Sequence, residues 1–348
     1  MTSRGTDWGL ALLVAALFAS GLLGYFAGTP GSAWVIGVHD ALGFAIALLV
    51  VIKLRRVWAR LIQKRPVTGT LATLFVALTL VSGWLWATGA NGSLGGYSVL
   101  VWHTALGAAL ALAVGVHLAL RARPLRRRDV ANRRQFLQVA AFGAGAVALW
   151  QLQRPVQRLF DMRAAKRRFT GSYEEGSFAG NAFPSTSWVA DSPRELDSSS
   201  YRLRLGGLVE DELELTADDL DAGDEIEATI DCTGGWYSRQ RWRGISLATV
   251  IDRARPRDGA SHVRVISHTG YRWGFELGDA RELLLATHVG DETLDHSHGA
   301  PARLVVPGAR GFQWVKWVVR IELHDGPDAG AAPSTVWSSL TDEGRGKA

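Results

Sequence analysis

The chain has 348 residues, enough for two or three domains, and a formal net charge of +5. Residues 1–168 carry 20 basic and 4 acidic side chains, whereas residues 169–348 carry 18 and 29. The positive charge flanks apolar segments, a pattern typical of membrane topology and not of nucleic-acid binding, so we expect no nucleic-acid partner. The single cysteine, Cys232, excludes an intramolecular disulfide and is therefore free or ligated.

Four long apolar stretches occupy the first 120 residues, at 8–27, 33–52, 67–88 and 98–120. Each is close to the length that spans a bilayer as a helix, and a fifth stretch at 136–152 is shorter. Lys and Arg cluster after the second and fourth stretches, and the loops after the first and third carry none. The positive-inside rule then predicts a multi-pass protein of the cytoplasmic membrane, with its acidic half on the periplasmic or extracellular side.

The fifth stretch begins with a basic pair, Arg133 and Arg134, followed by Phe136, Leu137 and a run rich in Gly and Ala at 139–146. This order resembles a twin-arginine export signal, although it lies inside the chain. The route that reads such signals carries proteins that are already folded, often with a cofactor inserted. The alternative is an ordinary pair of arginines flanking a membrane segment.

Two membrane segments repeat each other: VHDALG at residues 38–43 matches WHTALG at residues 102–107. The repeat puts His39 and His103 at similar depth in helices that start on the outer side. Ionisable residues inside membranes are costly and are functional candidates. Two facing imidazoles suit one b-type haem, and the alternative is a pair of hydrogen bonds between helices. The first four segments resemble small bacterial cytochrome b membrane subunits.

A third histidine, His117, lies 14 residues after His103 and so on the same helix face. The repeat puts Lys53 opposite it, and Lys is not an ordinary haem ligand. We therefore expect one haem, with His117 as a proton or quinone contact or an interfacial residue.

The acidic half follows a basic linker. Alternating apolar residues predict strands at 201–209, 212–215, 226–230, 263–267, 270–277, 302–306 and 315–323, with a helix ending near Arg253. The expected class is α+β after an all-α membrane bundle of four helices and an anchor helix. The expected domains are a membrane domain (1–130), a signal and anchor helix (131–152), a linker (153–180), an α+β domain (181–325) and a tail (326–348).

Cys232 ends the predicted strand 226–230 and is followed by two glycines and Trp236. A thiolate beside backbone that can approach a ligand closely suits a soft metal or a cofactor. The alternative is a small buried apolar side chain.

Three motifs in this order are CTGGW at 232–236, HGAPARLVVPG at 298–308 and GFQWVKW at 311–317. Together they resemble the sulfite oxidase-type molybdopterin domain, over about residues 183–323. That family includes sulfite oxidases, plant-type nitrate reductases and bacterial periplasmic methionine sulfoxide reductases. The resemblance ends near Leu323, so we expect the dimerisation domain of the larger sulfite oxidases to be absent.

The resemblance implies a role for each matching residue. Cys232 would ligate molybdenum, and Tyr271 would be the active-site tyrosine. His298 and Arg303 would contact the pterin and its phosphate, and Ser267 would supply a hydroxyl contact. The remaining cofactor-binding residues would be Trp314, Val315 and Lys316, together with the loop residues Asn181, Phe183, Pro184 and Ser185. These types suit a phosphate, since Arg offers a planar fork of donors and Lys a point charge.

Seven further residues could line an anion pocket or simply be exposed: Tyr237, Arg239, Arg241, Trp242, Arg243, Arg272 and Arg310. The whole pattern predicts a membrane-anchored enzyme with a molybdenum–molybdopterin cofactor. It would move an oxygen atom to or from a small oxyanion or an S- or N-oxide. The haem would exchange electrons with quinone or a redox partner protein. The alternative is a non-catalytic electron-transfer or sensory protein with a relict pterin-binding fold.

Overall fold

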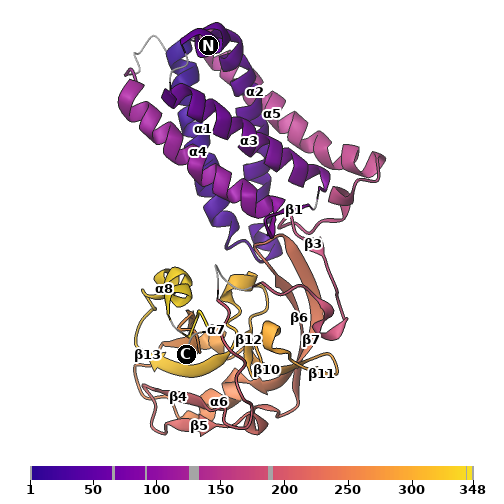
Figure 1. The fold of residues 1–348 in the computed structure, drawn as a ribbon, viewed down its shortest axis with the longest axis vertical. Coiled ribbons are helices and arrows are strands. Elements are labelled where there is room, and N and C mark those ends of the chain that lie inside the picture. Colours follow the sequence, from indigo (N-terminus) through magenta and orange to yellow (C-terminus); the bar gives the residue numbers. More distant parts are fainter. Residues whose placement is uncertain are drawn as a thin grey trace. The chain divides into compact units, whose positions relative to one another are not determined.

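The computed structural model describes residues 2–64, 67–90, 92–124, 133–186, 191–341 and 343–346. The basic clusters expected to set the topology lie partly outside these residues, at 65–66 and 125–132. The chain forms two compact units, Met1–Tyr173 and Glu174–Ala348. The first is helical and the second contains two sheets with short helices (Figure 1).

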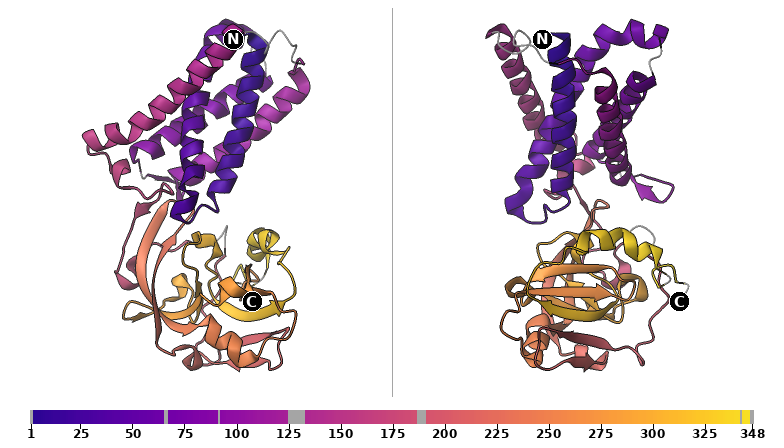
Figure 2. Two further views of the ribbon diagram at one scale, coloured as in Figure 1. Left: turned by 180° about the vertical axis from the view of Figure 1, so that it is seen from behind. Right: turned by 90° about the vertical axis from the view of Figure 1, so that its left-hand side faces the viewer.

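Long helices build the first unit: α1 (Ser3–Gly24), α2 (Ala33–Lys64), α3 (Val67–Thr88), α4 (Val99–Arg121) and α5 (Arg133–Leu159). The side chains of Thr2 and Ser98 cap α1 and α4 by accepting backbone N–H bonds. Helix α1 packs on α2 and α4, α3 on α4, and α5 on α2 (Figure 2). A short hairpin of β1 (Ser93–Leu94) and β2 (Tyr97–Ser98) precedes α4.

Among the described residues, five helices are long and apolar enough to cross a membrane. The first four of them share a small core centred on Val14, Ile46, Val76 and Leu110, one from each helix. Large apolar side chains also point outward, and Leu112 is 70% exposed. Such a surface, apolar outside as well as inside, is what lipid contact requires. The structure thus has five candidate membrane spans, matching the five apolar stretches.

The second unit contains two sheets. In one, β10 (Leu284–Val289) pairs with β11 (Glu292–Thr293), β12 (Arg303–Val305) and β7 (Trp236–Ser246), and β7 pairs with β6 (Asp224–Asp231). The other has the order β5 (Leu213–Leu215), β4 (Leu203–Gly207), β13 (Val318–His324), β8 (His262–Ser267), β9 (Arg272–Glu276). Strands β4 and β13 are parallel, and the other pairs are antiparallel. The short strand β3 (Tyr173–Glu174) lies at the boundary between the units.

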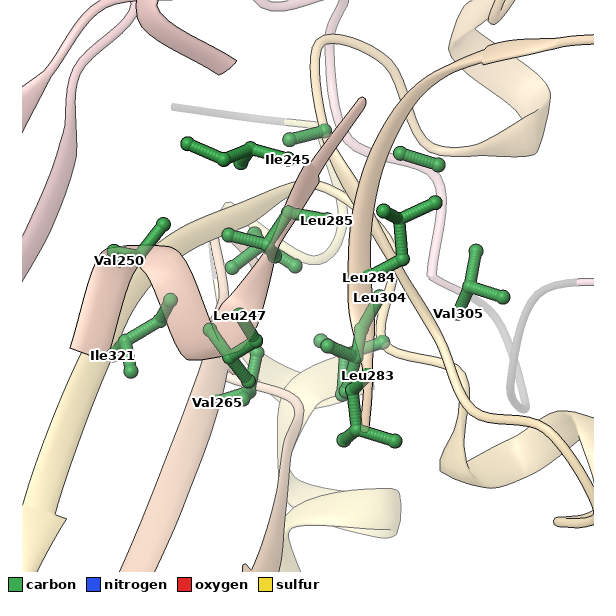
Figure 3. Packing of buried hydrophobic residues seen from close by; sticks show 14 of the residues in the cluster. Ile245, Leu247, Val250, Val265, Leu283, Leu284, Leu285, Leu304, Val305 and Ile321 are labelled. Atoms are coloured by element: carbon green, nitrogen blue, oxygen red, sulfur yellow. The ribbon is translucent and has the colours of Figure 1, made fainter. Parts of the chain in front are cut away.

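The core of this unit lies between the sheets and α6 (Leu247–Ala254). Ile245, Val250 and Leu285 are fully buried there, and Figure 3 shows their side chains with those of β8, β12 and β13. The alternating burial along β7 places one side of the strand in this core. The packing fixes the ends of β6, β7 and β12, and the candidate site is built at these ends.

The last described residues fold onto the second sheet. Helix α8 (Ala331–Trp337) packs on β9, where Ser334 accepts a bond from the Arg272 N–H and donates one to the Arg272 carbonyl. The short helix η8 (Ser338–Leu340) follows. Helix α7 (Leu277–Ala280) joins β9 to β10.

Candidate active site

Cys232 lies in the turn between β6 and β7. Its N–H donates to the Trp236 carbonyl at 2.8 Å, and the Gly235 N–H donates to the Cys232 carbonyl at 3.0 Å. Gly235 has φ of +98°, in the region that favours glycine. The Gly234 N–H points at the Cys232 sulfur at 3.3 Å. Burial raises the pKa of the Cys232 thiol above its usual range.

A buried ion pair supports this turn. Arg310 Nη1 lies 2.9 Å from Asp231 Oδ1, and both side chains are almost fully buried. Arg310 also donates to the Cys232 carbonyl at 3.3 Å. The chain then passes so close that a Cβ on Gly311 would lie 3.1 Å from the Cys232 Cα. Arg310 therefore holds the cysteine turn in place, and it is neither exposed nor part of the pocket surface.

Arg303 is a buried cation at the start of β12, only 1% exposed. One of its nitrogens donates to the His298 carbonyl at 2.8 Å, and its guanidinium carbon lies 5.2 Å from the Trp242 ring centre. Its Nε has no hydrogen-bond partner, and no carboxylate of the described residues lies within ion-pair distance. Burial lowers the pKa of Arg303 to about 9. A buried positive charge is costly unless it is paired, so this position suits a bound anion.

Lys316 supplies a second cation. Trp317 takes the left-handed conformation (φ 50°), so β13 begins only at Val318 and Lys316 lies outside the ladder. Lys316 Nζ donates to Ser185 Oγ at 2.8 Å and to the Ser297 carbonyl at 2.6 Å. Burial, and then the charge of Arg303, lowers the pKa of Lys316 to about 7. Two cations that line one pocket make a site for a phosphate-like group.

His298 connects the loop that contains Phe183 with the loop that contains Asp295. Its Nε2 lies 3.0 Å from the Phe183 carbonyl, and its Nδ1 lies 2.7 Å from Asp295 Oδ1. Both partners are acceptors, which favours the charged ring, but burial has the larger effect and lowers the pKa of His298. The Phe183 ring packs against the imidazole, with centroids 4.0 Å apart and ring planes tilted by 49°.

These residues surround one pocket of about 700 Å³ of empty space, counted out to its open mouth. Ten of the residues implied by the sequence line it: Phe183, Pro184, Ser185, Cys232, Ser267, Tyr271, His298, Arg303, Trp314 and Lys316. Segments more than 100 residues apart in the chain thus meet at a single concave site, as ligand sites typically do.

Asn181 and Val315 do not line the pocket. The Asn181 amide donates to Glu292 at 3.0 Å, and its oxygen accepts the Asp295 N–H at 3.1 Å, so this side chain ties the loop in place. Val315 is fully buried in the core and contributes its carbonyl to Leu304.

Tyr271 and Ser267 lie at the β8–β9 turn. The Tyr271 hydroxyl donates to the Phe312 carbonyl, which positions the phenol at the pocket. Burial, and then the Asp191 carboxylate, raises the pKa of Tyr271 well above its usual range. Ser267 Oγ accepts the Thr269 N–H at 3.3 Å.

Nine lining residues were not predicted from the sequence: Thr186, Asp191, Ile230, Thr233, Trp236, Thr269, Gly311, Phe312 and Trp317. Five of them (Thr233, Trp236, Gly311, Phe312 and Trp317) belong to the three motifs, so the motifs carried a signal for these. Asp191 and Thr269 lie outside every motif, and no feature of the sequence distinguishes them.

The other arginines proposed for an anion pocket lie outside it. None of Tyr237, Arg239, Arg241, Arg243 and Arg272 is among the lining residues. Arg241 is exposed, and three of the others are paired: Arg239 with Glu227, Arg243 with Asp221, and Arg272 with Asp328.

In the first unit the two repeated histidines face each other. The ring centroids of His39 and His103 are 6.2 Å apart and the rings are nearly perpendicular, at 86°. Ser20 Oγ donates to the Leu17 carbonyl at 3.1 Å and so accepts from His39 Nδ1, at 2.9 Å. His103 Nδ1 lies 3.0 Å from the Thr79 carbonyl, which can only accept. Both Nδ1 atoms therefore carry the proton, and both Nε2 lone pairs are free for a metal.

Glycines flank this pair of rings. A Cβ on Gly83 would lie 2.9 Å from His103 Cε1, and one on Gly21 would lie 3.5 Å from His39 Cε1. Gly43 and Gly107, one turn after each histidine, have no neighbouring heavy atom within 4 Å of where their Cβ would be. The arrangement leaves room beside the rings on the helix faces that carry them.

The third histidine belongs to a separate cluster. His117 Nδ1 lies 3.1 Å from Thr68 Oγ1, and Lys53 pairs with Asp7.

The second unit is similar to known proteins. Residues 189–332 match the family described as oxidoreductase molybdopterin binding domain. The catalytic subunit of a protein-methionine-sulfoxide reductase from Gluconobacter oxydans is 33% identical over 162 residues, 40% of this chain and 50% of the relative. A mitochondrial sulfite oxidase from Rattus norvegicus is 29% identical over 188 residues, 42% of this chain and 34% of the relative. The chain thus spans half or less of the length of these relatives.

Proposed function

Because residues 189–332 match the family described as oxidoreductase molybdopterin binding domain, we propose that the chain is a membrane-anchored molybdenum enzyme. It would transfer an oxygen atom to or from a small oxyanion or an S- or N-oxide. The observation that carries this proposal is the pair of cations Arg303 and Lys316, which line the same pocket as the only cysteine. Together they offer one thiolate to a soft metal and two donors to a phosphate.

A molybdenum–pterin cofactor would supply the two-electron oxo-transfer chemistry. The residues present fit it, because the Arg303 Nε and the Trp314 Nε1 are buried donors without a hydrogen-bond partner among the described residues. Cys232 would bind the metal, and Arg303 and Lys316 would hold the phosphate. His298 would orient the pterin loop through its bond to the Phe183 carbonyl. Tyr271 would hold its hydroxyl at the substrate end of the pocket.

A metal count on the purified full chain tests this function. We expect about one molybdenum per chain in the wild type and none in Cys232→Ser. Turnover of a sulfoxide or of sulfite with a redox dye should follow the metal. Wild-type protein that is exported and folded but free of molybdenum would overturn the proposal and favour the relict fold.

The membrane unit would carry one b-type haem between His39 and His103. His39 and His103 would hold the haem iron, and their ring centroids lie 6.2 Å apart. The fixed Nδ1 protons of both rings support the same assignment, since ligating histidines donate their other N–H to a fixed acceptor. The haem would pass electrons singly between the molybdenum site and quinone or another carrier.

The reduced-minus-oxidised spectrum of purified variants tests the haem. His39→Ala and His103→Ala should each abolish the same b-type band, whereas His117→Ala should keep it. If the wild type shows no such band, the two histidines only link helices, and electrons reach the pocket from a separate partner.

A further inference from the structure

A largely buried ion pair lies beside the two facing histidines of the first unit. Asp40 directly follows His39 in α2, and Arg167 Nη2 donates to Asp40 Oδ2 at 3.4 Å. The Arg167 side chain is only 12% exposed, and Asp40 supplies the one carboxylate of the described residues within ion-pair distance of it. The electrostatic field of Asp40 also reaches His103. The pair therefore lies at the depth of the candidate haem site.

The segment that follows α5 folds onto the end of α3 and holds this arginine. Its backbone passes so close that a Cβ on Gly89 would lie 2.9 Å from the Ala164 nitrogen. Further along, the Tyr173 hydroxyl donates to the Trp86 carbonyl at 3.1 Å, and the two rings are 5.1 Å apart. Arg167 lies between these two contacts in the chain. Its position is therefore fixed by the fold of the segment as well as by Asp40.

This segment is strongly positive. Residues 154–168 carry one acidic side chain, Asp161, and six basic ones: Arg154, Arg158, Arg163, Lys166, Arg167 and Arg168. The charges of Arg154 and Arg167 both act on Asp40. Two cations thus face one carboxylate beside the histidines, which leaves positive charge for a further anion.

We propose that Arg167 binds a propionate of the haem held by His39 and His103. The inference rests on the proposed haem and deepens it, because it assigns the residue that recognises the acidic edge of the porphyrin. A guanidinium presents five N–H donors, and among the described residues Asp40 accepts from one of them. Donors therefore remain for a second carboxylate, and the planar fork of an arginine matches carboxylate geometry.

This assignment gives Asp40 a positioning role. Its carboxylate holds the guanidinium from the side of α2, directly next to the ligand His39. The iron would be bound by the two imidazoles, and the acidic edge by the segment that leads out of the membrane unit. Haem affinity should then depend on the charge of the propionates and on Arg167 together.

Haem and its dimethyl ester test the inference, because they share the iron and the porphyrin ring and differ in the charge of the propionates. The full chain is purified in detergent from cells that cannot synthesise haem. Each compound is titrated into it, and the spectrum of bis-histidine ligation reports binding. In the wild type we expect the dissociation constant of the ester to be at least about tenfold higher than that of haem, as for loss of a hydrogen bond between charged groups.

Three variants separate this contact from a general effect of charge. Arg167→Gln should raise the dissociation constant of haem about tenfold and leave that of the ester within about twofold. Arg167→Lys, which keeps the charge but lacks the planar fork, should fall between Gln and the wild type. Lys166→Gln is the matched control, because it removes the same charge from the neighbouring residue, whose side chain is 77% exposed. Both of its dissociation constants should stay within about twofold of the wild type.

Three results overturn the inference while leaving the proposed haem intact. One is a wild type that binds haem and its dimethyl ester equally tightly, a comparison that needs no variant. Another is an Arg167→Gln protein with wild-type affinity for haem. The third is an Arg167→Gln protein that loses affinity for haem and ester equally, which would assign the arginine to the fold of the segment. A wild type that takes up neither compound with bis-histidine ligation overturns the proposed haem, and this inference with it.

Discussion

Arg303 shows at the scale of one residue how a binding site differs from a stable core. Its charge is fully buried and lies close to the rings of both Trp242 and Trp314, and no carboxylate of the described residues lies within ion-pair distance of it. Removing a charge from water without a counterion costs several kcal/mol, which only a bound anion would recover. The residue therefore destabilises the empty protein and serves the loaded one.

Replacing Arg303 with Met, which fills similar space without charge, should have opposite effects on the two forms. We expect the metal-free chain to gain about 1 to 4 kcal/mol in free energy of unfolding, as when other unbalanced buried charges are replaced. Molybdenum retention should fall below one tenth of the wild-type content. Denaturant unfolding in detergent and a metal count measure the two effects.

The matched control is Arg253→Met, at an exposed position of α6, where we expect a change within about 0.5 kcal/mol. A metal-free Arg303→Met protein that is less stable than the wild type would mean that the guanidinium is satisfied within the protein, contrary to the anion-site assignment.

The single cysteine permits a direct test of its environment. Burial raises the pKa of Cys232, so less thiolate is present at a given pH in the metal-free protein than for a free thiol. The rate of alkylation by iodoacetamide should therefore level off at a higher pH than that of a free thiol, which begins to level off near pH 8.5. Mass spectrometry follows the modification. Molybdenum-loaded protein should not react, and equal rates in both forms would argue against thiolate ligation.

The helices of the membrane unit repeat in pairs, α1–α2 and α3–α4. The same interval of 14 residues, about 21 Å along a helix, separates Thr6 from Ser20, Thr68 from Ser82, His39 from Lys53, and His103 from His117. The level that the positive-inside rule predicts to be the outer one contains the facing histidines, each beside a serine. The inner level contains His117 beside Thr68 and Lys53 paired with Asp7. The repeat counterpart of Asp7 is Gly69.

This comparison predicts how a second haem site could be opened. In the double variant Asp7→Gly with Lys53→His, the inner level gains a second histidine opposite His117 and loses the carboxylate of α1. We expect the haem content per chain to rise from about one to about two. The pyridine haemochrome assay on purified protein measures the change.

The single variant Lys53→His is the control, because it leaves Asp7 without its partner and should keep one haem. If the double variant folds with one haem, the inner level lacks room for a porphyrin. The sequence repeat then reflects helix packing and not a second haem site.

At the level of elements, the sequence predicted the five apolar helices and most strands, because long apolar runs and alternation report burial directly. Strand ends were less well predicted. The predicted strand 315–323 begins three residues later, since Trp317 adopts a left-handed conformation that no local pattern reveals. Asp191 and Thr269 were missed because their proximity depends on how the C-terminal segment packs, and that is a tertiary contact.

At the scale of the whole molecule, the uneven charge of the sequence corresponds to two separate units, one helical and one built on sheets. The resemblance of the motifs to a known family predicted that their residues share one site. Periodicity alone predicts elements and does not predict such tertiary contacts. The pairing of the arginines outside the pocket was not predictable, since an exposed-looking Arg acquires its partner only in the folded sheet.

The export route is a property of the whole chain, and the arginine pair at the start of α5 provides its test. Replacing both Arg133 and Arg134 with Lys keeps the positive charge on which the positive-inside rule depends. It removes the planar guanidinium groups, which differ from an ammonium in shape and donor geometry. If the pair acts as a twin-arginine signal, the first four helices should still insert and the second unit should stay in the cytoplasm.

Protease added to the outer face of intact spheroplasts measures the outcome. In the wild type, we expect loss of the second unit on digestion. In the Lys variant, at least about nine tenths should survive until the cells are lysed. Lys at Arg154 and Arg158, later in the same helix, is the matched control and should leave digestion unchanged. Equal digestion of wild type and Lys variant would show that α5 crosses the membrane by ordinary insertion. The molybdenum cofactor would then have to enter a domain that folds after translocation.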